Sequence, residues 1–183
     1  MTNFDLRVII GLGNPGPQFI KTRHNIGFRV LDALADQYQG AWCTQHNLNY
    51  AWTEIAIAEQ RILLVKPQTY MNDTGKVLPH LAKSGFKVEQ LLVVHDELEL
   101  PFGVLKFKQG GSAKGHNGLK SLISGWGDNF LRLRFGIDRP ARGDANLPVD
   151  KYVLAKFLPA EEQALPDKIV SAVQMITALV TGR

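Results

Sequence analysis

Apolar and polar residues follow two different periods along the chain, and these periods predict strands and helices in turn. Short apolar or alternating runs, typical of strands, cover residues 6–10, 52–57, 61–65, 91–95, 104–108 and 131–137. Apolar residues at helical spacing predict helices over residues 26–38, 72–85, 117–123 and 161–180. Both kinds of element occur along the whole length, without a dividing linker or an internal repeat. We therefore predict an α/β fold, a single three-layer domain over residues 1–183 with a mixed, mostly parallel twisted sheet flanked by helices.

The run over residues 91–95 is apolar up to His95, which is typical of a central strand covered on both faces. We expect the polar triplet from His95 to Glu97 to end this strand. The second and third predicted strands are separated by a short turn and are expected to form an antiparallel hairpin. The segment 139–149 is rich in Pro and Gly, which predicts a mobile connection.

The composition, 45% hydrophobic and 21% charged, is that of an ordinary globular protein and excludes a disordered or collagen-like chain. The apolar runs are shorter than the roughly 20 residues that a membrane span needs, and the N-terminal residues lack a secretion signal. We therefore expect a cytoplasmic protein without a membrane partner. The single cysteine, Cys43, excludes an intramolecular disulfide and disfavours a structural zinc site; beside Trp42, it is expected to be partly buried.

Positive charge is concentrated in residues 102–142, where eight basic residues accompany two acidic ones. Lys106 and Lys108 share one face of a predicted strand, and Arg132 and Arg134 share one face of another. We expect both arginines to face solvent or a ligand. A polyanion such as a nucleic acid is the candidate partner for this segment, and a solvated basic surface is the alternative.

Polar side chains follow the predicted strands at the points where a sheet binds ligands. Asn14, Asn72 and Asp96 come after strands, whereas His24 and Asn117 open helices. If the strands are parallel, these five side chains converge on one rim of the sheet. The set holds an imidazole, a carboxylate and three carboxamides, which suits hydrolysis by an activated water. His24 would be the general base, Asp96 would bind its second ring nitrogen, and the carboxamides would hold the substrate or the developing oxyanion.

Two other chemistries are disfavoured. The letters Gly11-Leu12-Gly13-Asn14-Pro15-Gly16 match the dinucleotide fingerprint, but Pro15 and Pro17 hold the chain extended where a helix should begin. We therefore expect no nucleotide cofactor. The run from His95 to Glu99 offers metal ligands, but on an extended segment His95 and Glu97 face away from Asp96, so we expect no metal. A non-catalytic RNA-binding module stays open as an alternative function.

Five blocks of residues resemble the bacterial peptidyl-tRNA hydrolase family, in that family's order and spacing. They are Gly11-Leu12-Gly13-Asn14-Pro15-Gly16, Thr22-Arg23-His24-Asn25-Ile26-Gly27, Lys66-Pro67-Gln68-Thr69-Tyr70-Met71-Asn72, His95-Asp96-Glu97-Leu98 and Gly115-His116-Asn117-Gly118-Leu119. The resemblance extends over the chain from end to end. It implies a monomeric, metal-independent α/β hydrolase that cleaves the ester between a peptide and the 3′-terminal ribose of tRNA, recycling tRNA from aborted translation.

The resemblance also implies roles for single residues. His24 matches the family's catalytic base and Asp96 its supporting carboxylate. The positions carried over to the substrate end are Asn14, which helps to distinguish blocked from free amino groups, Met71, which lines the peptide pocket, and Asn72, His116 and Asn117, which bind the end of the tRNA.

Phe19 stands where the family usually has tyrosine, so it keeps a face for stacking and loses the hydroxyl group. Tyr70 could stack on the terminal adenine. The body of the tRNA would then meet Lys106, Lys108 and Arg134, which would contact phosphates without reading bases.

Overall fold

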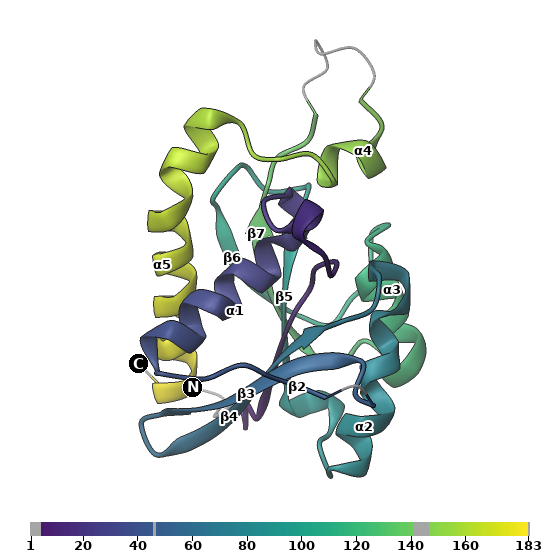
Figure 1. Cartoon of the computed structure of the whole chain (residues 1–183), viewed down its shortest axis with the longest axis vertical. Helices are drawn as coiled ribbons and strands as arrows, with labels where there is room; N and C mark the ends of the chain where they lie inside the picture. The colour runs from purple at the N-terminus through teal and green to yellow at the C-terminus, as the bar shows by residue number, and fades with distance from the viewer. Residues whose placement is uncertain (1–4, 46, 141–146, 183) are drawn as a thin grey trace.

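The computed structural model describes residues 5–45, 47–140 and 147–182, and seven strands in these ranges form one sheet (Figure 1). The strands are β1 (Val8–Gly11), β2 (Cys43–Thr44), β3 (Tyr50–Ile57), β4 (Gln60–Pro67), β5 (Leu91–Glu97), β6 (Leu105–Gln109) and β7 (Leu131–Gly136). The α-helices are α1 (Ile26–Gln37), α2 (Leu78–Lys83), α3 (Asn117–Trp126), α4 (Val149–Val153) and α5 (Pro159–Thr181). Short 3-10 helices are η1 (Pro17–Phe19), η2 (Arg23–Asn25), η3 (Met71–Val77) and η4 (Val88–Gln90).

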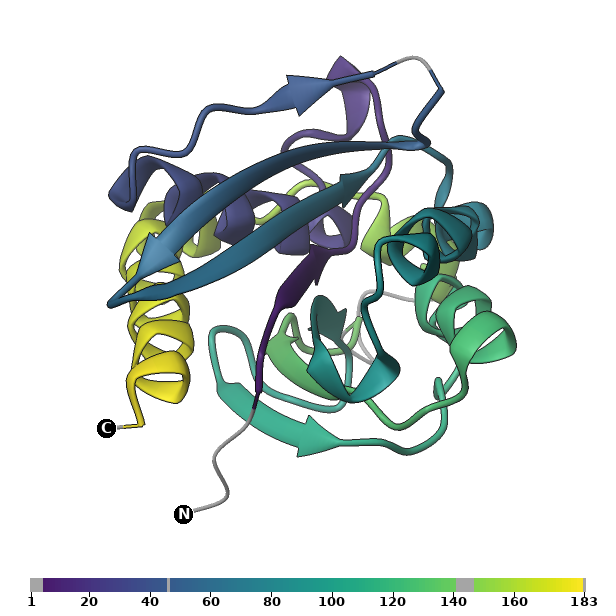
Figure 2. The ribbon, with the colours of Figure 1, turned by 90° about the horizontal axis from the view of Figure 1, so that it is seen from below.

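The sheet is mixed, as predicted, and its strand order is β2-β3-β4-β1-β5-β7-β6, with as many antiparallel pairs as parallel ones where mostly parallel pairing was expected. The four adjacent strands β4, β1, β5 and β7 are parallel to one another. The outer pairs β2–β3, β3–β4 and β6–β7 are antiparallel, and β3 and β4 form the expected hairpin. The sheet twists between this hairpin and the β6–β7 pair (Figure 2). The parallel centre places the carboxyl ends of β1, β4, β5 and β7 along one rim.

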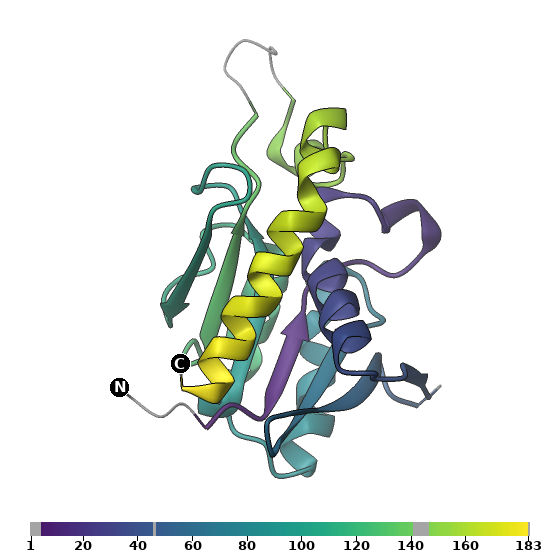
Figure 3. The same cartoon turned by 90° about the vertical axis from the view of Figure 1, so that its left-hand side faces the viewer.

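Helices cover both faces of the sheet, which gives the three predicted layers. Helix α5 runs alongside α1 on one face, where Leu31 and Ile176 pack with Val94 of β5 (Figure 3). On the other face, η3, α2 and α3 pack on the sheet, and Leu122 joins Val93 in a second apolar cluster. Successive β5 side chains therefore point into different clusters, and every residue of β5 is buried.

Strand β5 continues through His95, Asp96 and Glu97, so the prediction that this polar triplet ends the strand is wrong. Each of the three residues pairs with β7, and Glu97 lies opposite Gly136. Pairing with β7 gives the backbone N–H and C=O groups of these residues hydrogen-bond partners, so β5 continues although its side chains have become polar.

Helix α1 approaches the sheet so closely that only glycine fits at its second residue. A Cβ atom on Gly27 would lie 2.4 Å from the backbone nitrogen of Leu12 and 2.4 Å from the carbonyl oxygen of Val94. The absence of a side chain at Gly27 thus lets η2, which directly precedes α1, sit against the carboxyl ends of β1 and β5.

Three further expectations concern the membrane-spanning potential of the chain, the burial of Cys43 and the segment 139–149. By length and composition α5 could span a membrane, contrary to the estimate from short apolar runs, although Leu165 and Ile169 are buried in the core. The apolar content of α5 is thus explained in part by packing. Cys43 is exposed, so its predicted partial burial is wrong.

Residues 141–146 of the segment 139–149 lie outside the described residues. The predicted mobility of this segment therefore stays a prediction.

Candidate active site

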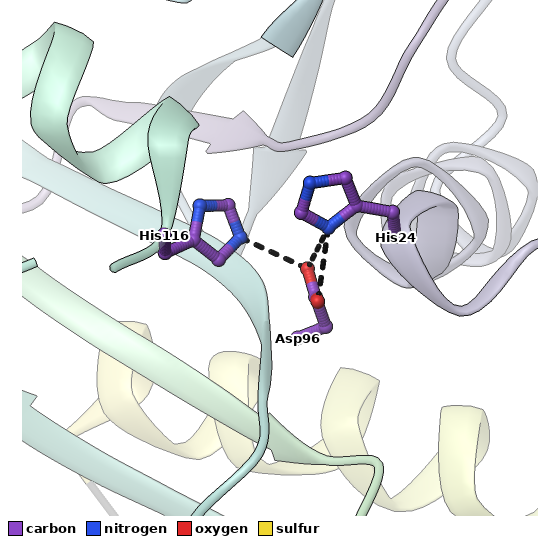
Figure 4. A group of neighbouring side chains, drawn as sticks. All are labelled: His24, Asp96 and His116. Atoms are coloured by element: carbon purple, nitrogen blue, oxygen red, sulfur yellow. Dashed lines mark hydrogen bonds and ion pairs between the residues drawn. The ribbon is translucent and has the colours of Figure 1, made fainter. Parts of the chain in front are cut away.

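Asp96 lies at the carboxyl end of β5, where two histidines from separate elements meet its carboxylate (Figure 4). The Nδ1 atom of His24, in η2, lies 2.9 Å from each carboxylate oxygen. The Nε2 atom of His116, the residue before α3, lies 2.9 Å from Oδ1. The predicted contact between Asp96 and His24 is thus confirmed. The contact with His116, which had been placed only at the substrate end, was missed.

The hydrogen bonds fix which nitrogen of each imidazole carries hydrogen. A carboxylate only accepts hydrogen bonds, so His24 donates through Nδ1 and His116 donates through Nε2. The backbone nitrogen of Leu119 donates to Nδ1 of His116 over 3.4 Å, which agrees with this tautomer. A neutral His24 therefore keeps an unshared electron pair on Nε2, as a general base requires.

Asp96 is held in its ionised form. Burial alone would raise the pKa of this carboxyl group. The neighbouring charges of His24 and His116, with the hydrogen bonds from both rings, outweigh burial and hold the pKa of Asp96 well below its usual range. A permanent negative charge thus faces the ring of His24.

His95 supports this cluster from the same strand. Its Nδ1 donates to the backbone oxygen of Asp96 over 2.7 Å, and its ring meets the His116 ring edge to face with centroids 5.3 Å apart. Burial, followed by repulsion from the charge of His116, lowers the pKa of His95 to about 3. His95 is therefore neutral at cellular pH, and its place in the block from His95 to Leu98 had not indicated this supporting role.

The low pKa of His95 predicts that the protein loses stability in mild acid. Between pH 6.5 and about 3 the unfolded chain binds the histidine proton and the folded protein does not, so stability falls as the pH falls. From pH 7 to pH 5 this one group should cost about 2 kcal/mol of unfolding free energy. His95→Asn keeps an N–H donor near the Nδ1 position and should remove this loss, as urea unfolding at the two pH values would measure. An equal loss in the variant would contradict a neutral, buried His95.

A cleft of about 270 Å³ opens over the cluster. Its walls include His24, Asp96, His116 and Asn117 together with the basic residues Lys108, Lys114, Arg132, Arg134 and Arg139. Val149 and Val153 of α4 close another side. The cleft thus places the His24–Asp96 pair beside a positively charged surface.

The remaining predicted substrate residues lie beside this cleft and do not line it. Asn14 is buried, and its Oδ1 accepts a hydrogen bond from the backbone nitrogen of Met71 over 2.8 Å. A Cβ atom on Gly118 would lie 2.5 Å from Sδ of Met71, so this side chain reaches the first turn of α3. Tyr70 is 64% exposed, and its ring meets Phe19 edge to face at 6.4 Å.

Asn72 and Asn117 are both exposed, at the beginnings of η3 and α3. The five residues expected to converge therefore form two adjoining groups. His24, Asp96 and Asn117 line the cleft, whereas buried Asn14 and exposed Asn72 lie outside its walls.

Two residues beside His24, neither of them predicted as a site residue, hold η2 in place. Asn25 exchanges two hydrogen bonds of 2.9 Å with the backbone of Asn14, which ties η2 to the end of β1. Arg23 is buried and donates to Glu161 over 2.8 Å and to the backbone oxygen of Lys156 over 2.7 Å, which ties η2 to the start of α5. Their position within the Thr22 to Gly27 block was the available signal.

The basic strand face is only partly as predicted. Lys106 lies opposite Arg134 and Lys108 lies opposite Arg132, so the four side chains share one face of β6 and β7. Nε of Arg134 pairs with Glu97 over 2.8 Å. The prediction that Arg132 faces solvent is wrong, although Arg132 and Arg134 both line the cleft, as a residue that faces a ligand would. Arg132 is buried, because the loop between β6 and α3 covers its guanidinium group.

The set of residues that could ligate a metal differs from the one considered in the run from His95 to Glu99. Among the residues that the structure describes, His24, Asp96 and His116 offer ligand atoms within 4.8 Å of one another. These atoms hydrogen-bond to one another in the structure. Glu97, from the earlier set, pairs with Arg134 instead.

Comparison with known proteins agrees with the five blocks. The sequence model of a family described as peptidyl-tRNA hydrolase matches residues 8–183. The peptidyl-tRNA hydrolase of Geotalea uraniireducens is 43% identical over 178 residues, covering 96% of this chain and 91% of the relative. That of Gloeobacter violaceus is 44% identical over 181 residues, covering 95% of this chain and 89% of the relative.

Solved structures give the same result. The crystal structure of peptidyl-tRNA hydrolase from Acinetobacter baumannii superposes with a TM-score of 0.90 and 34% sequence identity, covering 100% of this chain and 92% of that one. The match includes the whole sheet and the helices on both of its faces. This chain therefore belongs to the peptidyl-tRNA hydrolase family.

Proposed function

We propose that this protein hydrolyses the ester between the peptide, or N-blocked aminoacyl group, and the 3′-terminal ribose of tRNA. The observation that carries this proposal is the contact of Asp96 with Nδ1 of His24, because it leaves Nε2 of His24 free to take a proton from water. Membership of the family supports the choice of substrate. We also propose that the protein acts as a cytoplasmic monomer, without a cofactor or a metal.

The chemical step needs one water and one base. As the water oxygen attacks the ester carbonyl, its proton moves to Nε2 of His24, and Asp96 stabilises the imidazolium that forms. When the tetrahedral intermediate collapses, the bond to the ribose oxygen breaks and His24 returns the proton to that oxygen. The products are the peptide carboxylic acid and free tRNA.

The surrounding residues bind the end of the substrate. Asn117, which lines the cleft, and Asn72, which is exposed, would donate amide hydrogens to the substrate or to the developing oxyanion. Asn14, Met71 and His116 complete this group. The rings of Phe19 and Tyr70 would stack on unpaired bases, which suits a single-stranded tRNA end. Phe19 offers no hydroxyl for a hydrogen bond.

The experiment that tests this function is release of free tRNA from N-acetyl-aminoacyl-tRNA, beside the unblocked aminoacyl-tRNA, with and without a chelator. We expect cleavage of the blocked substrate alone, unchanged by the chelator. Binding of tRNA without cleavage would favour the alternative of a non-catalytic RNA-binding module. Cleavage that the chelator abolishes would contradict a mechanism without metal.

Lys106 and Lys108 are proposed to contact tRNA phosphates, together with Arg134. Lys106→Ala and Lys108→Ala should each raise KM for full-length substrate and lower the slope of log KM against log salt by about one, because each lysine would neutralise one phosphate. Turnover of a minimal ester without the tRNA body should not change. Lys83→Ala, at the exposed end of α2, is the matched control. Unchanged KM and salt dependence in both variants would exclude the basic face as the tRNA site.

A further inference from the structure

Arg132 of β7 lies beneath the loop of residues 110–116, which joins β6 to α3. Its side chain is buried, and Nη1 donates to the carbonyl oxygen of Ser112 over 2.8 Å, while Nη2 donates to that of Gly111. The guanidinium carbon lies 4.9 Å from the ring centroid of Phe130. One arginine thus fastens two consecutive carbonyl groups of the loop to the sheet.

This loop depends on such anchors for its shape. Four of its residues, Gly110, Gly111, Lys114 and Gly115, adopt positive φ angles. The carboxylate of Asp128 accepts a hydrogen bond from the backbone nitrogen of Gly111 over 2.9 Å and adds a second anchor at the same point. Without the hydrogen bonds to Arg132 and Asp128, few local interactions would hold the loop of residues 110–116 in one conformation, because its glycines allow many backbone angles.

The end of the loop carries an active-site group. The backbone nitrogen of His116 donates a hydrogen bond to the carbonyl oxygen of Ala113 over 2.9 Å. This turn links Gly111 and Ser112, which Arg132 holds, to His116. Nε2 of His116 then donates to Oδ1 of Asp96. Ser112 and His116 are thus joined by a short, hydrogen-bonded segment, so the position of Ser112 bears on the imidazole that contacts Asp96.

We propose that Arg132 is a positioning residue, which acts by holding the loop so that His116 reaches Asp96, and that it is not a ligand of tRNA phosphates. The kinetic consequence rests on the proposed function, whereas the structural consequence does not. Arg132 contrasts here with Lys106 on β6, which is exposed on the same strand face. A guanidinium group offers its N–H donors from separate nitrogens in a fixed fork, whereas the three donors of a lysine share one nitrogen on a flexible stem, so Lys at this position would hold the two carbonyl groups less rigidly.

The test compares Arg132→Gln and Arg132→Lys with Lys106→Gln, using steady-state cleavage of N-acetyl-aminoacyl-tRNA. For Arg132→Gln we expect kcat to fall about tenfold with KM within about twofold, the size of effect expected when a hydrogen bond to a charged group is lost. The kcat of Arg132→Lys should lie between that of Arg132→Gln and that of the wild type. Lys106→Gln should raise KM alone. A rise in KM with unchanged kcat for the arginine variants would overturn the proposal and make Arg132 a phosphate ligand.

A second measurement needs no substrate. In the free protein, the ring N–H signals of His24 and His116 can be followed by nitrogen-15 NMR and assigned with His116→Ala. Arg132→Lys should broaden or remove the His116 signal and retain that of His24, with little change in thermal unfolding. An unchanged His116 signal would refute the positioning role, even if the protein proved to have no hydrolase activity.

Discussion

Replacing His24 with alanine is expected to reduce kcat about a thousandfold, within the range that general acid–base catalysis supplies. The reason is that Nε2 of His24 is the nitrogen that the hydrogen bond to Asp96 leaves unprotonated, so the variant has no group in this position to take a proton from water. Affinity for uncleaved tRNA should stay the same, because the imidazole acts on water. Rapid-quench turnover and filter binding would measure the two quantities separately.

His80→Ala provides the matched control for this experiment. His80 lies in α2 and is absent from the walls of the cleft. Its removal should leave kcat and tRNA affinity as they are. If His24→Ala lost affinity and turnover by the same factor, His24 would be a structural residue of η2 and the proposed mechanism would fail.

The polar residues that follow the predicted strands were sufficient to predict the contact of His24 with Asp96, on the condition that the strands are parallel. The apolar run that ends at His95 favoured this pairing, and β1 and β5 are parallel in the structure. The prediction followed from the positions of the two residues: His24 opens the helix after the first predicted strand, and Asp96 comes after the fourth.

What the sequence argument missed depends on loops that fold back over the sheet. Alternation along β7 correctly assigned Arg132 and Arg134 to one face, but it could not show that the loop of residues 110–116 covers only Arg132. The same loop brings His116 to Asp96. Contacts of this kind join residues about 20 positions apart through positive φ angles, and no periodicity encodes them.

Hydrogen bonds of Asn14 connect the two groups of predicted substrate residues. Asn14 is fixed by Asn25 on one side and holds the backbone of Met71 on the other, so the block that contains His24 and the block that contains Asn72 are fastened to each other. A substrate lying across both groups would therefore meet a base and a binding surface that are already in register. Preorganisation of this kind lowers the entropic cost of reaching the reactive geometry.

Asp96→Asn tests the other half of the proposed catalytic pair and should lower kcat by about 10³- to 10⁴-fold, as the equivalent change does to a histidine base elsewhere. Asparagine offers one oxygen and one NH₂ group where the carboxylate accepts from both His24 and His116. If the NH₂ group faces His24, the ring must accept through Nδ1 and carry its hydrogen on Nε2, where it cannot act as a base. Binding of tRNA should be retained, and an unchanged kcat would remove Asp96 from the mechanism.

The same variant has a signature in stability that does not depend on catalysis. Because the pKa of Asp96 is depressed in the folded protein, its carboxylate stabilises the fold fully above the unfolded pKa of about 3.8 and loses this effect as the pH falls through the folded value. The difference in unfolding free energy between wild type and Asp96→Asn should therefore shrink as the pH falls below about 3.8. Urea unfolding at a series of pH values in this acid range measures the difference. A difference that grew as the pH fell below about 3.8 would mean that burial, which raises the pKa of Asp96, outweighs the two imidazoles.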